Sequence, residues 1–234
     1  MKKIKIAAGM SEGFDYGRVM EQMKEALDAG CDYCHSDAAD MYEVRDLQLI
    51  GGHNIMYYVR KITEKPIECH FHTQECDLLF IEKIAMVGCS MLILPAERFI
   101  GAQLVSVINW CREKNMKVGL TIGSYAPLGL VEEAVYDIDR LHVETQGAGD
   151  CLRESSLDLI RRARKMIDEK NPSCELSVEG KISPENLEKV VACMPDTIVF
   201  SGAVFEDPEG ITAGVKKCRE AVDRAAKKYD YSEV

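Results

Sequence analysis

The strongest constraint on the fold is a regular alternation of strand and helix signals along the whole 234-residue chain. Short apolar segments predict strands, and longer segments with apolar residues at helical spacing predict the helices between them. Eight such units predict an α/β protein with a single (β/α)8 TIM barrel as one domain over residues 1–234. An open doubly wound sheet is the alternative, but it needs no eighth unit.

The predicted boundaries follow from turn and capping residues, such as Gly30 and Gly88 after two helices and Ser183 with Pro184 at the start of another. The predicted strands are 3–8, 31–37, 66–72, 90–95, 116–122, 138–145, 174–180 and 196–202. The predicted helices are 15–29, 54–62, 77–87, 100–115, 127–135, 155–169, 183–192 and 208–228.

Charge and hydropathy exclude several classes of partner. The net charge of -10 excludes nucleic acid, whose phosphates require clustered Lys and Arg. No apolar run reaches the ~18 residues that a membrane span needs. The N-terminal MKKIKIAAGMSEG has too short an apolar run for a signal peptide. We therefore expect a cytoplasmic protein that contacts neither membranes nor nucleic acid.

The ten cysteines are scattered through predicted strands and helices rather than arranged as a disulfide framework. Cys31 and Cys34 form a C-x-x-C pattern, which often indicates zinc or redox chemistry. In a strand, however, residues three apart face opposite sides, so these two thiols are not expected to bind one metal. We expect reduced, buried cysteines.

Histidines and carboxylates are concentrated near the C-terminal ends of the predicted strands. His35 and Asp37 are two residues apart, so both project from the same face of a strand, and His70 and His72 repeat this spacing. Barrel active sites lie where the strands end. We expect these side chains to converge on one divalent metal or one acid/base site. The residues are His35, Asp37, His70, His72, His142, Glu144 and Glu179.

Four segments resemble motifs of the ribulose-phosphate 3-epimerase family, from one end of the chain to the other. CHSDAAD resembles the strand-two motif His-x-Asp-x-Met-Asp, and ECHFH resembles the strand-three His-Leu-Met. SVEG resembles Val-Asp-Gly-Gly after strand seven, and VFSGAVF resembles Ala-Gly-Ser-Ala-Ile-Phe after strand eight. The resemblance implies a divergent member of this family, with the ribulose-phosphate-binding type of TIM barrel.

The resemblance also implies one divalent metal ion, held by two histidines and two acidic residues. The implied ligands are His35, Asp37, His70 and Glu179, with Glu179 in place of the family's Asp. Zinc is the first candidate for the ion, and iron, manganese and cobalt also suit this mixture of ligands.

The implied activity is that of an isomerase, a metal-dependent epimerase of a phosphorylated ketose. Epimerisation beside a ketone removes a proton and returns one on the other face, which requires an acid and a base that flank the substrate. Asp37 and Glu179, on strands two and seven, suit these roles. A metal held by the same residues would polarise the carbonyl.

The implied substrate-binding residues include several that depart from the family pattern. His72, His142 and Ala39 stand where the family has methionines, while Asp150 and Lys181 change the charge of the phosphate-binding loops. These departures favour a sugar phosphate other than ribulose 5-phosphate. The implied substrate-binding residues are His72, His142, Gln146, Gly147, Gly149, Gly180, Lys181, Ser201 and Gly202.

Two alternatives remain open from the sequence. One is a metal-assisted lyase or aldolase on the same barrel, although the Asp-x-Lys-x-x-Asp signature of related decarboxylases is absent from the segment 37–40, Asp-Ala-Ala-Asp. The other is a non-catalytic protein that binds a sugar phosphate. In either case we expect a small phosphorylated sugar as ligand and a homo-oligomer.

Overall fold

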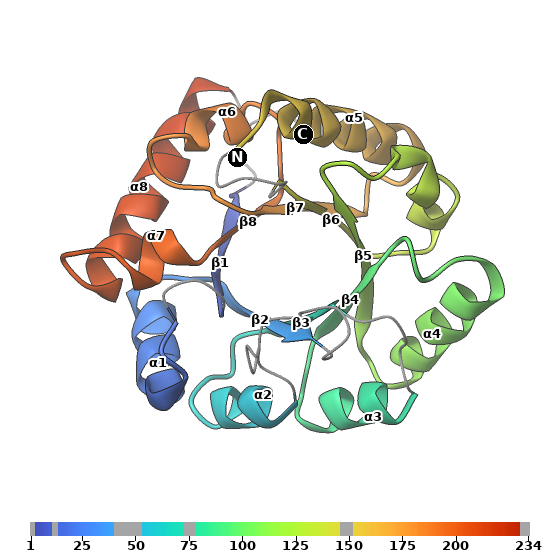
Figure 1. Cartoon of the computed structure of the whole chain (residues 1–234), viewed down its shortest axis with the longest axis horizontal. Helices are drawn as coiled ribbons and strands as arrows, with labels where there is room; N and C mark the ends of the chain where they lie inside the picture. The colour runs from blue at the N-terminus through green and yellow to red at the C-terminus, as the bar shows by residue number, and fades with distance from the viewer. Residues whose placement is uncertain (1–2, 11–13, 40–52, 73–77, 146–151, 230–234) are drawn as a thin grey trace.

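Eight parallel strands form a closed barrel in the computed structural model, which describes residues 3–10, 14–39, 53–72, 78–145 and 152–229. Each strand pairs with its neighbours in sequence, and β1 closes the barrel by pairing with β8 (Figure 1). The predicted (β/α)8 fold is therefore confirmed. The strands are β1 (Lys5–Gly9), β2 (Tyr33–Ala39), β3 (Ile67–His72), β4 (Met91–Pro95), β5 (Lys117–Gly123), β6 (Arg140–Glu144), β7 (Glu175–Glu179) and β8 (Thr197–Phe200).

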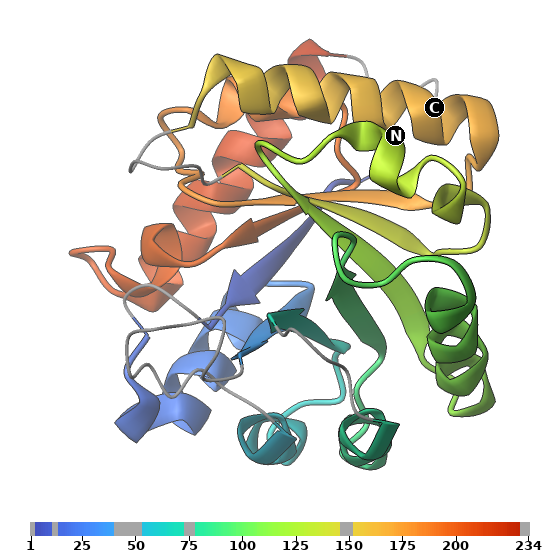
Figure 2. The ribbon, with the colours of Figure 1, turned by 45° about the vertical axis from the view of Figure 1, so that its right-hand side comes forward.

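The helices form a ring outside the barrel, and Figure 2 shows the strands running between helices on both sides. None of the helices in the described ranges is long and apolar enough to cross a membrane. The α-helices are α1 (Val19–Ala29), α2 (His53–Arg60), α3 (Leu78–Met86), α4 (Gly101–Glu113), α5 (Glu154–Lys170), α6 (Leu187–Val191), α7 (Gly202–Phe205) and α8 (Ile211–Lys228). Three 3-10 helices are η1 (Tyr16–Arg18), η2 (Leu128–Val131) and η3 (Ala134–Tyr136).

The helix predicted at 15–29 begins as η1 and becomes α-helical only at Val19, and two further predicted helices were wrong in type or start. Residues 127–135 form η2 and the start of η3 rather than an α-helix. The helix predicted from Ser183 begins at Leu187, because the Asn186 side chain ties the preceding turn together. Its Oδ1 accepts the Ser183 N–H at 3.0 Å, and its Nδ2 donates to the Lys181 carbonyl at 2.8 Å. The short helix α7 was not predicted.

The main apolar core lies between the strands and the ring of helices. Alternate strand residues such as Leu141, Val143, Leu176 and Val178 are fully buried in it. Helix α5 is amphipathic and buries the face that includes Leu159, Ile160, Ala163 and Ile167, at helical spacing. Because both faces of each strand are covered, the strands can carry apolar residues outward and polar residues inward.

The inside of the barrel is polar, whereas branched apolar residues usually fill this space. Arg140, on β6, is 4% exposed and forms ion pairs with Glu68 on β3 and Glu175 on β7. Lys5, on β1, reaches Glu175 at 2.6 Å, and Glu68 Oε1 lies 2.6 Å from His35 Nδ1. We call Lys5, Glu175, Arg140, Glu68 and His35 the ionic chain; it runs from the N-terminal end of the strands to the middle of the barrel.

Aspartates fix the start of three strands by one repeated contact. Asp32, Asp139 and Asp196 immediately precede β2, β6 and β8. Each carboxylate accepts a hydrogen bond from a backbone N–H of the preceding strand, at 2.8, 2.9 and 2.7 Å respectively. These contacts lie at the opposite end of the strands from the polar cluster described next, and they stabilise the barrel rather than the site.

Candidate active site

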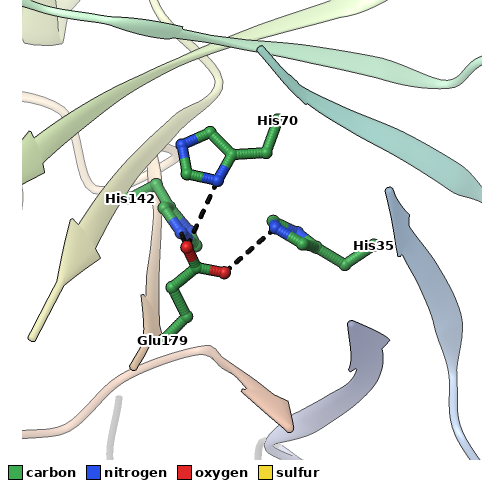
Figure 3. Close-up of side chains that lie close together, drawn as sticks. All are labelled: His35, His70, His142 and Glu179. Carbon is green, nitrogen blue, oxygen red and sulfur yellow. Dashed lines mark ion pairs between the residues drawn. The ribbon is translucent and has the colours of Figure 1, made fainter. Parts of the chain in front are cut away.

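Three imidazoles surround the carboxylate of Glu179 inside the barrel (Figure 3). Glu179 Oε2 lies 3.0 Å from His35 Nε2, and Oε1 lies 3.2 Å from His70 Nδ1 and 3.4 Å from His142 Nε2. The three rings are fully buried, and their ligand atoms and that of Glu179 lie within 4.8 Å of one another. These four residues form what we call the imidazole quartet.

Asp37 lies beside the imidazole quartet, in a second set of possible metal ligands with His70 and His72. Its Oδ1 is 3.2 Å from His35 Nε2, 3.4 Å from His70 Nδ1 and 3.6 Å from His72 Nε2. His72 is the most exposed of these imidazoles, with 29% of its side chain accessible. Asp37 therefore stands between the buried rings and the open end of the barrel.

The far nitrogen of each quartet imidazole faces a polar partner. His35 Nδ1 lies 2.6 Å from Glu68, whose carboxylate is held ionised by Arg140, so this nitrogen carries the proton and donates it. His142 Nδ1 lies 2.9 Å from Ser177 Oγ. His70 Nε2 lies 3.2 Å from Glu144 Oε1. The nitrogen that remains on each ring faces Glu179.

The charges of the site balance one another strongly. Burial alone would lower the pKa of His35 and of His70, but Glu179 and Asp37 outweigh it and raise the pKa of both well above the usual value. Burial holds the pKa of His142 below the usual value. Burial would raise the pKa of Asp37 and of Glu179, but the imidazoles lower both. The carboxylates of Asp37 and Glu179 can thus be neutralised in either of two ways, by protonated His35 and His70 or by a divalent cation.

The donor atoms fit a divalent transition metal. His35 Nε2, Asp37 Oδ1, His142 Nε2 and both ring nitrogens of His70 are buried and make no hydrogen bond of acceptable geometry to any described residue. Unpartnered buried polar atoms are costly. All of these except His70 Nε2, which faces Glu144, lie around one space where a metal ion would satisfy them. Imidazole nitrogens with carboxylate oxygens are ligands of zinc, iron and cobalt.

A cavity of about 820 Å³ opens above these residues at the C-terminal ends of the strands. Asp37, His72, Glu144 and Glu179 line its floor, and a wall is formed by residues that follow β7 and β8. Lys181 and Lys189 belong to that wall, and so does Glu206. The wall residues include Gly180, Lys181, Ser183, Asn186, Lys189, Ser201 and Gly202.

Most of the residues singled out in the sequence come together in this cavity. His35, His70 and Glu179 meet as expected, while His142, expected at the substrate, takes a place among the possible ligands. Gly180, Lys181, Ser201, Gly202 and His72 line the cavity. Gln146, Gly147, Gly149 and Asp150 lie outside the described residues.

Three contributors were given no role in the sequence analysis: Glu68, Arg140 and Ser177. A period-two pattern places Glu68 on the same face as His70, and Arg140 on the same face as His142. That signal was available, but it does not reveal which strands face one another across the barrel.

The family model for the ribulose-phosphate 3 epimerase family matches residues 6–205. The ribulose-phosphate 3-epimerase of Methanocaldococcus jannaschii is 28% identical over 228 residues, which cover 96% of this chain and 94% of the relative. That of Aquifex aeolicus is 26% identical over 207 residues, which cover 86% of this chain and 91% of the relative.

Solved structures support the fold. The 3-hexulose-6-phosphate synthase of Salmonella typhimurium superposes with a TM-score of 0.74 and covers 95% of this chain and 100% of its own, at 16% identity. At that identity only the shared barrel is established. The family model, in contrast, spans seven strands in full and nearly all of the cavity wall. The chain therefore belongs to the ribulose-phosphate 3-epimerase family.

Proposed function

We propose that the protein is a metal-dependent epimerase of a phosphorylated ketose, and that its substrate is a sugar phosphate other than ribulose 5-phosphate. Membership of the family identifies it as an isomerase of the racemase and epimerase class, as expected from the sequence. The observation that carries the proposal is the placement of Asp37 and Glu179 on the floor of the cavity, beside converging imidazoles.

Asp37 and Glu179 are proposed to exchange the proton. They lie on β2 and β7, both face the cavity, and both keep a lowered pKa, so each is ionised and able to accept a proton. One ionised carboxylate would remove the proton beside the ketone, and the other, which must first take up a proton from solvent, would return that second proton on the opposite face. His72, 3.6 Å from Asp37 and partly exposed, can carry protons between Asp37 and solvent, which restores the starting protonation after each turnover.

A divalent cation, when bound by residues of the imidazole quartet, would polarise the substrate carbonyl and offset the negative charge that forms on its oxygen. Without a cation, the carboxylates of Asp37, Glu144 and Glu179 at the floor would repel an anionic sugar. Zinc, iron or cobalt suits these ligands best. The metal is thus proposed both for catalysis and for substrate entry.

The phosphate is proposed to lie against the wall that follows β7 and β8. Lys181 supplies a charge there, and the backbone N–H groups of Gly180, Ser201 and Gly202 supply donors without side-chain bulk. At Gly9, which faces this wall, an added Cβ would lie 2.6 Å from Ser201 Oγ, so only glycine leaves Ser201 in place.

His72, which lines the cavity in place of an apolar side chain, supports a substrate different from that of the named relatives. An imidazole beside the reacting carbons can bind a further hydroxyl group. We also propose a single domain, a cytoplasmic location and a homo-oligomer. Exposed Tyr57 and Tyr58 on α2, with Leu79 and Met86 on α3, support self-association, which light scattering of the purified protein would measure.

The test is elemental analysis of the purified protein together with deuterium uptake from D2O into a panel of ketose phosphates. We expect bound metal and deuterium at the carbon beside the ketone. Asp37→Asn and Glu179→Gln should each slow exchange about 10²–10⁴-fold, the usual contribution of a general acid or base. Exchange that persists unchanged in both variants would contradict the assignment. A metal-loaded protein that exchanges no member of the panel would contradict the proposed substrate class.

A further inference from the structure

We infer that His142 is a ligand of the metal ion, so that this chain holds the ion with three imidazoles and Glu179. The inference rests on the metal dependence proposed above and changes the ligand set implied by the sequence resemblance. The starting observation is that His35, His70, His142 and Glu179 form one compact set of donor atoms, whereas Asp37 belongs to another with His70 and His72.

The position of His142 is fixed by strand pairing. It lies in the middle of β6, in register with Ser177 on β7 and Thr121 on β5. Its ring centroid is 4.8 Å from that of His70 and 5.4 Å from that of His35. The ring is fully buried, so Nε2 has no access to solvent and faces only the centre of the imidazole quartet.

The outer contacts of His35 and His142 match those that orient metal-binding histidines, and the outer nitrogen of His70 faces a carboxylate without hydrogen-bond geometry. In such sites the second ring nitrogen donates to a carboxylate, carbonyl or other polar group, which fixes the tautomer and leaves a lone pair toward the metal. His35 has Glu68 in this position and His142 has Ser177, at 2.6 and 2.9 Å. His70 has Glu144 at 3.2 Å. A histidine that merely filled space would not need its inner nitrogen left without a hydrogen bond.

The alternative is that His142 only pairs with Glu179. That pair is the longest of the three between Glu179 and the imidazoles, at 3.4 Å, and Nε2 makes no hydrogen bond in it. It therefore leaves a buried nitrogen unsatisfied, which is costly. Coordination of a cation by the three imidazoles and Glu179 satisfies all four donors together.

The net charge of the ion and its ligands predicts which metals this site prefers. Three neutral imidazoles and one carboxylate leave a divalent ion with a net charge of about +1, whereas two imidazoles and two carboxylates would cancel it. Nitrogen-rich sites favour zinc, cobalt and iron over manganese and magnesium. We therefore expect manganese to bind this chain poorly.

The experiment counts imidazole ligands in the full-length protein loaded with Co²⁺. Proton NMR in H2O should show three paramagnetically shifted ring N–H signals that disappear in D2O, because Glu68, Ser177 and Glu144 face the three outer nitrogens. X-ray absorption of the Zn²⁺ form should require three imidazoles. Two signals and two imidazoles in the unmodified protein would overturn the inference, and so would failure to bind either ion.

Four variants sharpen the result. His142→Gln and His142→Met should each remove one N–H signal and weaken metal binding more than the ~10–100-fold that loss of an outer partner costs. His72→Gln, outside the quartet, should retain three signals. Ser177→Ala should weaken binding roughly tenfold and retain three imidazoles in the absorption spectrum. Three signals that persist in His142→Gln would overturn the inference.

The same preparations separate this inference from the proposed function. Three imidazoles with no deuterium exchange would support the ligand set and contradict the proposed substrate class. Two imidazoles with normal exchange would overturn the ligand set and leave the epimerase proposal standing.

Discussion

Lys181 carries its charge to the cavity wall from a backbone position that disfavours a side chain. Its φ is 50°, and the preceding Gly180 also has a positive φ of 96°. A residue other than glycine in this region costs roughly 1 kcal/mol or more, and such strain is concentrated at functional sites. The resemblance aligns Lys181 with a family glycine, so the strained lysine replaces a residue suited to that backbone. We attribute its presence to the phosphate that is proposed to bind at this wall.

Lys181→Gly is expected to stabilise the fold while it weakens substrate binding. Removal of the strain should raise the free energy of unfolding by about 1 kcal/mol. Loss of a charged hydrogen bond, which contributes about 1.5–3 kcal/mol, should raise KM for a phosphorylated ketose about ten- to a hundredfold. Denaturant unfolding and steady-state kinetics measure the two effects.

Lys181→Ala is the matched control, because it removes the charge and keeps the positive φ. It should raise KM as Lys181→Gly does but without the gain in stability. An unchanged KM in both variants would show that Lys181 does not contact the phosphate.

Single residues of the site were easier to predict than their partners. Period-two spacing placed His35 with Asp37 and His70 with His72, because a strand fixes which side chains share a face. The contact of Glu68 with Arg140 joins β3 to β6 across the interior, and it depends on barrel closure and strand register. Spacing along the chain carries no information about such a contact. The role inferred for His142 was missed for the same reason.

At the scale of elements, α7 and α8 pack without room for a side chain at Gly214. A Cβ there would lie 2.8 Å from the Ala203 carbonyl oxygen and 2.9 Å from that of Val204. Both carbonyls are backbone atoms of α7, which follows the cavity-lining Ser201 and Gly202. The position of one cavity wall therefore depends on a glycine in the last helix.

Gly214→Ala is expected to destabilise the protein, although alanine is favoured over glycine by about 1 kcal/mol within a helix. Forcing an extra methyl group against backbone should cost about 1–3 kcal/mol and outweigh that gain. Thermal unfolding should show a lower Tm, and KM should rise because α7 must move. Gly129→Ala is the control, since nothing lies within 4 Å of its added Cβ. A Tm equal to or above that of the unmodified protein would contradict the packing argument.

The elements themselves were largely predictable, because alternating strand and helix signals repeat eight times and the strands are buried on both faces. The wrong helix predictions lie where local contacts outweigh the helical spacing of apolar residues. Asn186 closes a turn that delays α6, and residues 127–135 wind as 3-10 turns rather than one helix. The four-residue α7 is too short to produce a periodic signal.

At the scale of the whole molecule, metal and protons are expected to compete for the same imidazoles, and binding of either one stabilises the folded protein. In the metal-free protein His35 and His70 have a raised pKa. The protonated rings therefore contribute to the free energy of unfolding, and this contribution is present in full below the usual histidine pKa of about 6.5. It is lost as the pH rises through their folded-state pKa. Metal needs neutral imidazoles, so its stabilisation grows over the same interval.

The difference in Tm between metal-loaded and chelator-treated protein should therefore widen from pH 6 to pH 9. Free metal at 100 times Kd stabilises by about 2.7 kcal/mol, which corresponds to roughly 5–10 °C for a chain of this length. Calorimetric titration at pH 7 in buffers of different ionisation enthalpy should also detect proton release on metal binding. A Tm difference that is constant with pH would contradict this linkage.

The polar interior of the barrel has a consequence for how this sequence can diverge. Lys5, Glu175, Arg140 and Glu68 hold one another in place below His35. Replacing Arg140 alone leaves buried carboxylates without a positive partner, and replacing Glu68 alone leaves a buried guanidinium without a negative one. Either change should lower the free energy of unfolding by about 3–5 kcal/mol. Exchange of the whole group for apolar residues can be nearly neutral. We therefore expect the four charged residues of the ionic chain to be inherited or lost together, because an intermediate that lacks one of them is less stable.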